Sequence, residues 1–299
     1  MRRHGGPARW ERHYDAPMDS TSGQPADADH ELPAWGLERQ VIGAQVLPSA
    51  WPLAEAREWA WGGSRGSGVS VCVLDSGVDA SHPLVGTVQR SVAVELDAGD
   101  QLQITDDDHG DLFGHGTACA GIIRALAPDC ELHSVRVLGP QLTGSGDALL
   151  TGMRWAVEQG FDVINLSLST RRKPLIETLY ELTDAAYFGR SLIVAAAHNL
   201  PVDSYPWRFA AVVSVASHEG SDRDEFFYNP QPPVEFFAPG LDVEVAWLDG
   251  ATIRASGNSF AAPHIAGRAA LILSKHGRLE PFELKTALRT CANNVSLAA

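Results

Sequence analysis

Residues 146–168, GDALLTGMRWAVEQGFDVINLSL, decide the fold class because they join a helix pattern directly to a strand pattern. Residues 146–159 predict a helix that stops at Gly160, and residues 161–168 predict a short, apolar, β-rich strand. A strand with so few polar residues is typical of a parallel sheet that is covered on both faces. This stretch therefore favours an α/β fold.

The same alternation continues on both sides of this stretch. Further strands are expected at 69–74, 131–138, 191–197 and 210–216, and further helices at 116–126, 175–189, from Ser259 onward and around 280–291. We predict an α/β fold of three layers, with a mostly parallel central sheet and helices on both faces. Sites in such sheets gather beyond the carboxyl ends of the strands, so the residues that follow each strand are the first candidates.

The N-terminal residues have a different composition from the rest of the chain. Residues 1–35 are rich in Gly, Pro, Asp, Ser and Arg without a sustained period, so we expect a disordered or removable extension, followed by one domain over 36–299. The arginines near the start are not followed by an apolar run, and no window has the length of a membrane span. We expect a cytoplasmic protein.

Charge and cysteine content narrow the function classes. The 299 residues carry a formal net charge of -14, which argues against nucleic acid as a partner, because phosphate binding needs clustered Lys and Arg. We expect no nucleic acid, no membrane and no cofactor; the oligomeric state stays open. The four cysteines match neither a zinc-finger spacing nor a disulfide framework, so we expect reduced thiols.

Three short motifs each place one reactive side chain among glycines: LDSGVDASHP (74–83), FGHGTACAG (113–121) and SGNSFAAPHIAG (256–267). A serine hydroxyl becomes a good nucleophile when a neutral imidazole accepts its proton, and a carboxylate must then orient that imidazole. Asp75, His115 and Ser259 supply these three groups. His115 and Ser259 also stand before helical stretches, where the helix dipole disfavours an imidazolium and favours negative charge.

The order Asp, His, Ser, with D-S-G, H-G-T and G-x-S-x-A-x-P around the three residues, resembles the subtilisin-like serine proteases from about Val69 to Gly267. The resemblance implies Asp75 as the orienting carboxylate, His115 as general base and acid, Ser259 as nucleophile and Asn199 as the oxyanion-hole donor. It also implies that a peptide or protein substrate lies as an added strand between two segments, Leu142 to Gly146 and Asn165 to Ser169. The predicted substrate-binding residues are Leu142, Thr143, Gly144, Asn165, Leu166, Ser167, Leu168, Ser169 and His198.

The sequence departs from the family pattern at several positions. Asn258 stands where the family usually has threonine, so its amide is expected either to donate to the oxyanion or to misplace Ser259. Ser169 and His198 replace usual glycines, so we expect a small or polar pocket for the residue before the cut bond. Leu84 and the uninterrupted stretch 121–129 predict that the family's tight calcium site is absent, and no metal is expected elsewhere.

Several alternatives remain beside this interpretation. A catalytically impaired relative that only binds peptides is the rival of another class, while an esterase is disfavoured because its order would be Ser, Asp, His. Cys119 is expected to be a small core residue one helical turn after His115. The acidic run 106–108 followed by His109 is interpreted as a solvated loop, because its spacing fails that of an EF-hand. Fewer residues precede the catalytic region than the usual folded pro-domain of the family needs, and this resembles intracellular processing proteases.

Overall fold

A computed structural model describes residues 45–47 and 51–297 of the chain. The extension that we expect over residues 1–35 lies outside the described residues.

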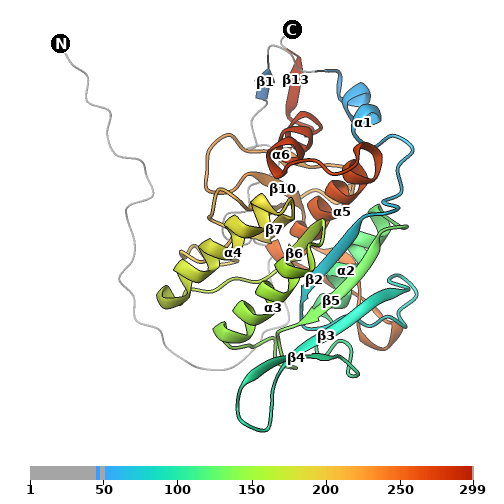
Figure 1. The fold of residues 1–299 in the computed structure, drawn as a ribbon. Helices are drawn as coiled ribbons and strands as arrows, with labels where there is room; N and C mark the ends of the chain where they lie inside the picture. Colours follow the sequence, from blue (N-terminus) through green and yellow to red (C-terminus); the bar gives the residue numbers. More distant parts are fainter. Residues whose placement is uncertain (1–44, 48–50, 298–299) are drawn as a thin grey trace, which may run out of the picture. The chain divides into compact units, whose positions relative to one another are not determined.

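The core of the fold is a nine-stranded sheet with the strand order β4-β3-β5-β2-β6-β7-β8-β10-β9 (Figure 1). All pairs from β3 to β10 are parallel, and β4 and β9 are antiparallel strands at the two edges. The strands are β2 (Ser70–Asp75), β3 (Val88–Leu96), β4 (Leu102–Asp106), β5 (Glu131–Arg136), β6 (Val163–Leu166), β7 (Leu192–Ala196), β8 (Val213–His218), β9 (Phe227–Tyr228) and β10 (Phe236–Pro239). The predicted mostly parallel sheet is confirmed.

Helices cover both faces of this sheet. They are α1 (Leu53–Trp61), α2 (His115–Leu126), α3 (Gly146–Gln159), α4 (Ile176–Phe188), α5 (Asn258–His276) and α6 (Pro281–Thr290). Because side chains alternate along a strand, β2 contributes side chains to two separate hydrophobic clusters, one on each face of the sheet. Val71 and Val73 pack in a cluster with α2 and α5, whereas Cys72 and Leu74 pack in a second cluster with α3 and α4. The three-layer arrangement follows from this alternation.

The predicted helices and strands agree with the described ones to within a few residues. Gly160 has φ 70° and ends α3 in the left-handed conformation that glycine adopts at low cost. The sequence analysis did not anticipate the smaller pieces, whose patterns are short or irregular. These are β1 (Gln45–Leu47) paired with β13 (Val295–Leu297), β11 (Val243–Ala246) paired with β12 (Thr252–Ala255), the 3-10 turns Lys173–Leu175 and Leu248–Gly250, α1, the hairpin β3–β4, and the strands β9 and β10.

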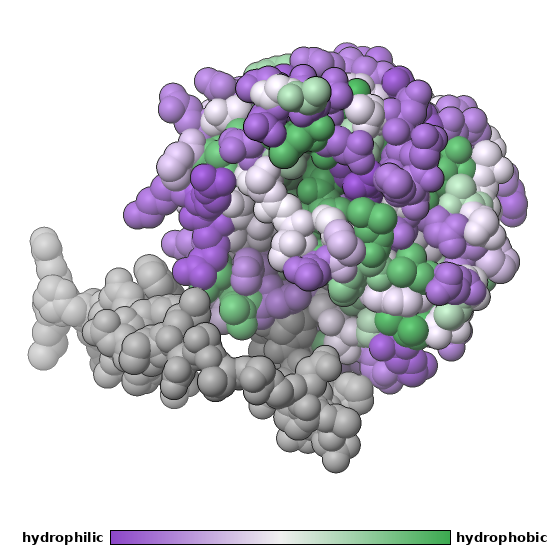
Figure 2. Space-filling view, turned by 90° about the horizontal axis from the view of Figure 1, so that it is seen from below, coloured by the Kyte–Doolittle hydropathy of each residue, from purple (hydrophilic) through white to green (hydrophobic). Residues whose placement is uncertain are grey.

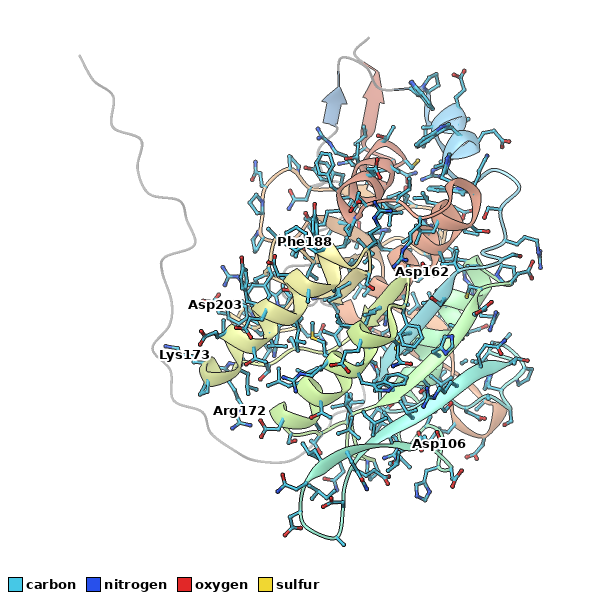
Figure 3. All side chains as sticks on the ribbon, in the orientation of Figure 1. Asp106, Asp162, Arg172, Lys173, Phe188 and Asp203 are labelled. Carbon is cyan, nitrogen blue, oxygen red and sulfur yellow. The ribbon has the colours of Figure 1, made fainter. Side chains whose placement is uncertain are left out.

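The candidate site lies where the parallel strands end and the helices begin. In Figure 3, Asp162 marks the residue before β6 at its amino end, while Arg172 and Lys173 lie toward the other end of the sheet, where α3 and α4 begin. Asp75 is the last residue of β2, and His115 is the first of α2. Parallel strands therefore bring their polar carboxyl ends to one edge, as expected for this class of sheet.

The four cysteines, Cys72, Cys119, Cys130 and Cys291, are all buried and unbridged. None of the described helices combines the length and the hydropathy needed to cross a bilayer.

Candidate active site

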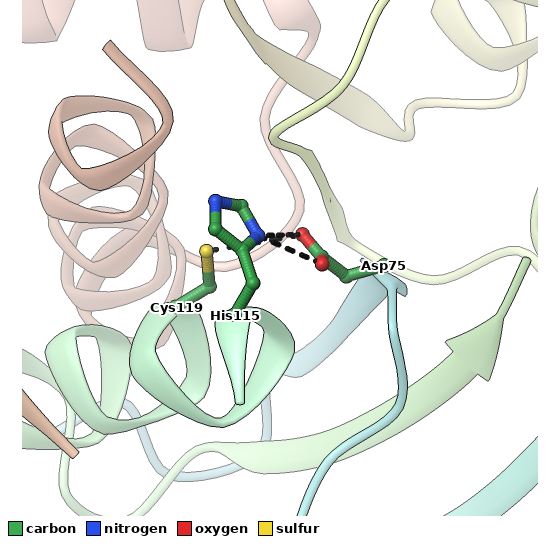
Figure 4. Close-up of side chains that lie close together, drawn as sticks. All are labelled: Asp75, His115 and Cys119. Carbon is green, nitrogen blue, oxygen red and sulfur yellow. Dashed lines mark hydrogen bonds and ion pairs between the residues drawn. The ribbon is translucent and has the colours of Figure 1, made fainter. Parts of the chain in front are cut away.

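Asp75 and His115 form a buried, hydrogen-bonded pair (Figure 4). The Nδ1 atom of His115 lies 2.8 Å from Oδ1 and 2.9 Å from Oδ2 of Asp75. An ionised carboxylate only accepts hydrogen bonds, so Nδ1 carries the hydrogen and Nε2 keeps its lone pair for a proton from elsewhere. This is the tautomer that a general base needs.

Burial and the neighbouring carboxylates shift the pKa of His115 in opposite directions. Burial alone would lower the pKa of the imidazole, but the charge and hydrogen bond of Asp75, with a smaller contribution from Asp111, outweigh burial and raise the pKa above its ordinary value. The imidazolium that forms during catalysis is therefore stabilised, as a base that accepts a serine proton requires.

Asp111 is a second buried carboxylate that the sequence analysis missed. Its Oδ1 accepts hydrogen bonds from the Ser76 hydroxyl and from the backbone N–H groups of Phe113 and Gly114, at 2.8, 2.9 and 2.8 Å. Its Oδ2 accepts from the backbone N–H and the hydroxyl of Thr117, at 2.8 and 2.6 Å. Asp111 therefore ties the end of β2 to the start of α2 and fixes the position of His115 relative to Asp75.

Two glycines allow this close approach. Gly114 has φ 111°, and a Cβ there would lie 2.5 Å from the Trp247 ring. A Cβ on Gly116 would overlap the carbonyl oxygen of Gly77 and come within 3.2 Å of the Asp75 Cβ. A side chain at Gly116 would therefore push α2 away from the end of β2, and a side chain at Gly114 would displace the Trp247 ring.

Ser259 lies in the first turn of α5, beside the Asn199 amide. A Cβ placed on Gly257 would lie 3.2 Å from Ser259 Oγ and 3.5 Å from Asn199 Nδ2, so both atoms flank the same small space. The Oδ1 atom of Asn199 accepts the backbone N–H of Asn258 at 2.9 Å. This bond fixes the amide orientation and leaves Nδ2 as a donor toward the space beside Ser259, as an oxyanion hole requires.

A polar chain from β6 supports the backbone of the nucleophile. The Ser167 hydroxyl donates to the Ser259 carbonyl oxygen at 2.8 Å, and Asn165 Nδ2 donates to Ser167 Oγ at 3.1 Å. The Cys119 thiol lies 3.4 Å from Ser167 Oγ and 3.6 Å from the Ser259 carbonyl oxygen. Burial, followed by the charge of Asp75, raises the thiol pKa well above its ordinary value, so Cys119 stays a neutral packing residue under the site.

His115, Ser259 and Asn199 line one cleft of about 430 Å³. Within the described residues no hydrogen bond joins the Ser259 hydroxyl to His115, although both side chains line the cleft. Catalytic hydrogen bonds of this kind often become short only when a substrate is bound. Figure 2 views the molecule from below Figure 1 and shows hydrophobic residues near the middle of this face, framed by hydrophilic ones.

Most of the predicted substrate-binding residues line this cleft. Leu142, Thr143 and Gly144 form one wall, and Ser167, Leu168, Ser169 and His198 are also part of the lining.

Asn165 and Leu166 do not line the cleft, unlike the other predicted substrate-binding residues. Both are fully buried inside β6, which is paired on its two sides with β2 and β7. Asn165 supports the site indirectly, because it donates a hydrogen bond to Ser167, which in turn binds the Ser259 carbonyl oxygen. The lining residues that the sequence analysis missed are Leu138, Leu149, Thr170, Arg172, Ala196 and Ala197. Thr170 and Ala197 are next to predicted residues, so adjacency in sequence is the signal that could have found these two.

Asn258 is a buried anchor that does not line the cleft. Its Oδ1 accepts the backbone N–H of Ser217 at 2.9 Å, and its Nδ2 donates to the carbonyl oxygens of Ala197 and His198 at 3.2 and 3.3 Å. The expectation that this amide donates to the oxyanion is therefore wrong. Instead, Asn258 joins α5 to the segment that carries Asn199.

Within the acidic run 106–108 at the end of β4, Asp107 binds an arginine. Both carboxylate oxygens of Asp107 accept from Arg136 at 3.1 Å, and Glu95 binds the same guanidinium at 2.7 Å. In the part of the chain that the structure describes, the one set of three potential metal ligands in mutual reach is Asp75, His115 and Cys119. Since Asp75 and His115 form a hydrogen-bonded pair, we assign these two residues to acid–base chemistry and Cys119 to packing.

Comparison with known proteins agrees with this geometry. The sequence profile of the subtilase family matches residues 66–298. The chain belongs to the subtilase family. It is therefore a serine-type endopeptidase of the hydrolase class by descent, and the resemblance of the three motifs is confirmed.

Among the relatives of this subtilase, subtilisin DY from Bacillus licheniformis is 31% identical over 268 residues, which cover 84% of the chain and 93% of the relative. Subtilisin Savinase from Lederbergia lenta is 30% identical, covering 78% of the chain and 86% of the relative. The chain spans 61% of the alkaline protease from Alkalihalobacillus alcalophilus, with 30% identity.

Two solved structures are similar to the whole fold of the subtilase. The S41 psychrophilic protease gives a TM-score of 0.66 at 29% identity and covers 79% of this chain and 86% of its own. A cold-adapted subtilisin-like serine proteinase gives a TM-score of 0.62 at 27% identity, with coverages of 89% and 94%. These likenesses confirm the predicted fold.

Proposed function

We propose that this subtilase hydrolyses internal peptide bonds through an acyl-enzyme on Ser259. The observation that carries the proposal is the buried Asp75–His115 pair, which shares one cleft with Ser259 and Asn199. Ser259 Oγ attacks the substrate carbonyl carbon while its proton passes to His115 Nε2. The Asn199 amide stabilises the oxyanion, and His115 returns the proton to the leaving amine. Water then repeats the sequence and releases the acid product.

We also propose that the pocket for the residue before the cut bond is small and polar. The support comes from Ser169 and His198. The Ser169 hydroxyl bonds to Ser204 Oγ at 2.9 Å, and Ser204 Oγ also accepts the indole N–H of Trp207 at 2.8 Å. This chain fixes the Ser169 hydroxyl in the wall of the cleft.

His198 adds a hydrogen-bond donor to the same lining. Its Nδ1 accepts the backbone N–H of Leu200 at 2.9 Å, so the neutral ring carries its hydrogen on Nε2. Burial, and then the nearby charge of Arg171, lower the pKa of His198, which keeps the ring neutral. Side chains that accept hydrogen bonds therefore fit this pocket better than Phe or Tyr.

The experiment that tests both proposals is the digestion of a diverse peptide pool, read by mass spectrometry. We expect the wild type to cut internal bonds, with few cuts after Phe or Tyr, and we expect the Ser259→Ala variant to cut none. Equal cutting by the two proteins would refute the role of Ser259. Preferred cutting after large aromatic residues would refute only the polar pocket.

The peptide-binding alternative predicts a different result in the same experiment. A module that only binds would leave the pool intact and still retain peptides when it is immobilised. We favour the enzyme because His115 has the tautomer of a base and Asn199 the orientation of an oxyanion donor, and a binding module needs neither.

We further propose that this protease works inside the cell on a dedicated protein substrate. Four buried, unbridged thiols support this proposal, because reducing compartments keep cysteines in this form. Fractionation of the producing cells, followed by immunoblotting, tests it. Recovery of the protein in the culture medium alone would contradict an intracellular role.

A further inference from the structure

The lining of the cleft has an unusual charge composition. Its described residues include one side chain with a permanent charge, Arg172, and two imidazoles, His115 and His198, but no Asp or Glu. The chain as a whole carries 37 acidic and 23 basic residues. A substrate that enters the cleft therefore meets a cation and hydrogen-bond donors there, although the protein as a whole is strongly negative.

The guanidinium of Arg172 lies against the start of α3. Its Nη1 atom is 3.2 Å from the position that a Cβ on Gly146 would take, and Gly146 is the first residue of the helix. Figure 3 shows Arg172 at this end of the molecule. Because the helix N-terminus also carries partial positive charge, both groups favour an anion at this place.

The backbone that carries Arg172 is held at both ends. Thr170 exchanges two hydrogen bonds with Tyr205, at 2.8 and 2.9 Å, and the Arg172 N–H donates to the Thr170 hydroxyl at 3.2 Å. On the other side, the buried Leu175 donates its N–H to the Arg172 carbonyl oxygen at 3.0 Å. Only the long side chain is left to adapt to a ligand, which limits the entropy cost of binding.

The arginines of the described chain differ in whether a carboxylate binds them. Five of them form ion pairs with a carboxylate: Arg65, Arg136, Arg190, Arg208 and Arg254. Within the described residues, Arg172 forms no ion pair. A planar guanidinium of this kind can bind a carboxylate through two parallel hydrogen bonds. Its neighbours Arg171 and Lys173 are exposed and extend the positive charge along the rim.

We propose that Arg172 is a specificity residue that selects substrates with an Asp or Glu two to four residues before the cut bond. This inference rests on the proposed peptidase function. The amino side of the bond is assigned because Arg172 follows Ser169 by three residues on the cleft wall that carries the proposed pocket. At about 3.3 Å per residue, an added strand brings one of these side chains to the guanidinium. The net charge of the protein repels such a substrate at long range, so the selection is local.

Pairs of isomeric, internally quenched peptides test this inference. One member carries Glu at the second, third or fourth position before the cut bond and Gln at a distant position, and the other has the two residues exchanged. Both members have the same composition and net charge, so long-range attraction or repulsion cancels. At one of the three positions we expect kcat/KM to favour the first member by about three- to tenfold in low salt, and less at 0.5 M NaCl.

Two charge-reversal variants identify the residue responsible. Arg172→Glu should abolish or invert the preference. Lys173→Glu makes a similar change of charge in the next residue, which does not line the cleft, and should retain it. Thermal melting checks that both variants fold. Equal cutting of the isomers at all three positions, or an equal loss of preference in both variants, would overturn the inference.

Binding to the Ser259→Ala variant separates this inference from the proposed function. Fluorescence anisotropy with labelled isomers should show the same preference in Kd without any cutting. If the wild type cuts peptides but neither assay shows a preference, only the role of Arg172 is refuted. If the wild type cuts nothing while the isomers differ in Kd, the peptidase proposal is refuted and the role of Arg172 in binding acidic side chains is retained.

Discussion

Asp111→Asn is the substitution that tests best whether the loop before α2 is built around a carboxylate. Asp111 is buried, and its two oxygens accept five hydrogen bonds. Since Oδ1 accepts three of them, an asparagine would keep its oxygen there and turn its NH₂ group toward Thr117. The Thr117 hydroxyl can rotate to accept from that group, but the Thr117 N–H would face another donor.

The expected loss follows from this one mismatch. A buried N–H that loses its charged acceptor costs about 2 to 3 kcal/mol, so the melting temperature should fall by about 5 to 10 °C for a domain of this size. The charge of Asp111 also contributes to the raised pKa of His115, after the larger effects of burial and Asp75. The acid limb of the kcat/KM profile should therefore move to lower pH in the variant.

Calorimetry and pH–rate profiles provide the two readouts, and Asp108→Asn is the matched control. Asp108 is exposed and lies three residues away in the sequence, so its substitution removes the same charge without touching the network. We expect the control to melt within about 1 °C of the wild type. If both variants melt alike and share the wild-type acid limb, Asp111 does not position His115 and the reasoning is refuted.

Three further predictions concern charges and donors in and beneath the site. Asp75→Asn should lower turnover by about 10⁴ and move the acid limb to lower pH, because the His115 pKa loses its main support; an unmoved limb would contradict the pairing. Asn199→Ala should lower kcat by about 10² to 10³ with KM nearly unchanged, and a rise in KM alone would assign it to ground-state binding. Burial, followed by Arg268, lowers the pKa of His264 to about 3. The unfolded chain therefore binds a proton near pH 6.5 that the native state refuses, and stability should fall by about 1.4 kcal/mol per pH unit from there toward pH 3. His264→Gln should flatten that dependence in denaturant titrations; parallel curves would contradict it.

The sequence was sufficient for the parts of the fold that depend on periodicity. The strand at 69–74 and the helix at 146–159 have strong, uninterrupted patterns, and Gly160 marks its boundary by its backbone freedom. The hairpin β3–β4 was missed because β4 is the edge strand, β3 is the strand next to it, and both mix polar with apolar residues. Edge strands carry little of the burial signal that makes a central strand recognisable.

The candidate site could be predicted in part for a similar reason. Asp75, His115, Ser259 and Asn199 each follow a strand or begin a helix, so local sequence marks them. Asp111 carries no local signal, because its importance comes from five contacts that exist only after folding. Asn165 was predicted as a substrate contact because it is close in sequence to residues that line the cleft. In the structure it lies in β6, which is paired on both sides, and it is fully buried.

The central claim is that one imidazole, oriented by a buried carboxylate, activates one hydroxyl. Reaction with a fluorophosphonate, followed by peptide mass mapping, tests it most directly, since the reagent bonds to an activated serine without any substrate preference. We predict a single adduct on Ser259 in the wild type and a rate at least about 10³-fold lower in the His115→Ala variant. A folded wild type that stays unlabelled at Ser259, or a variant that reacts at the wild-type rate, would contradict the mechanism.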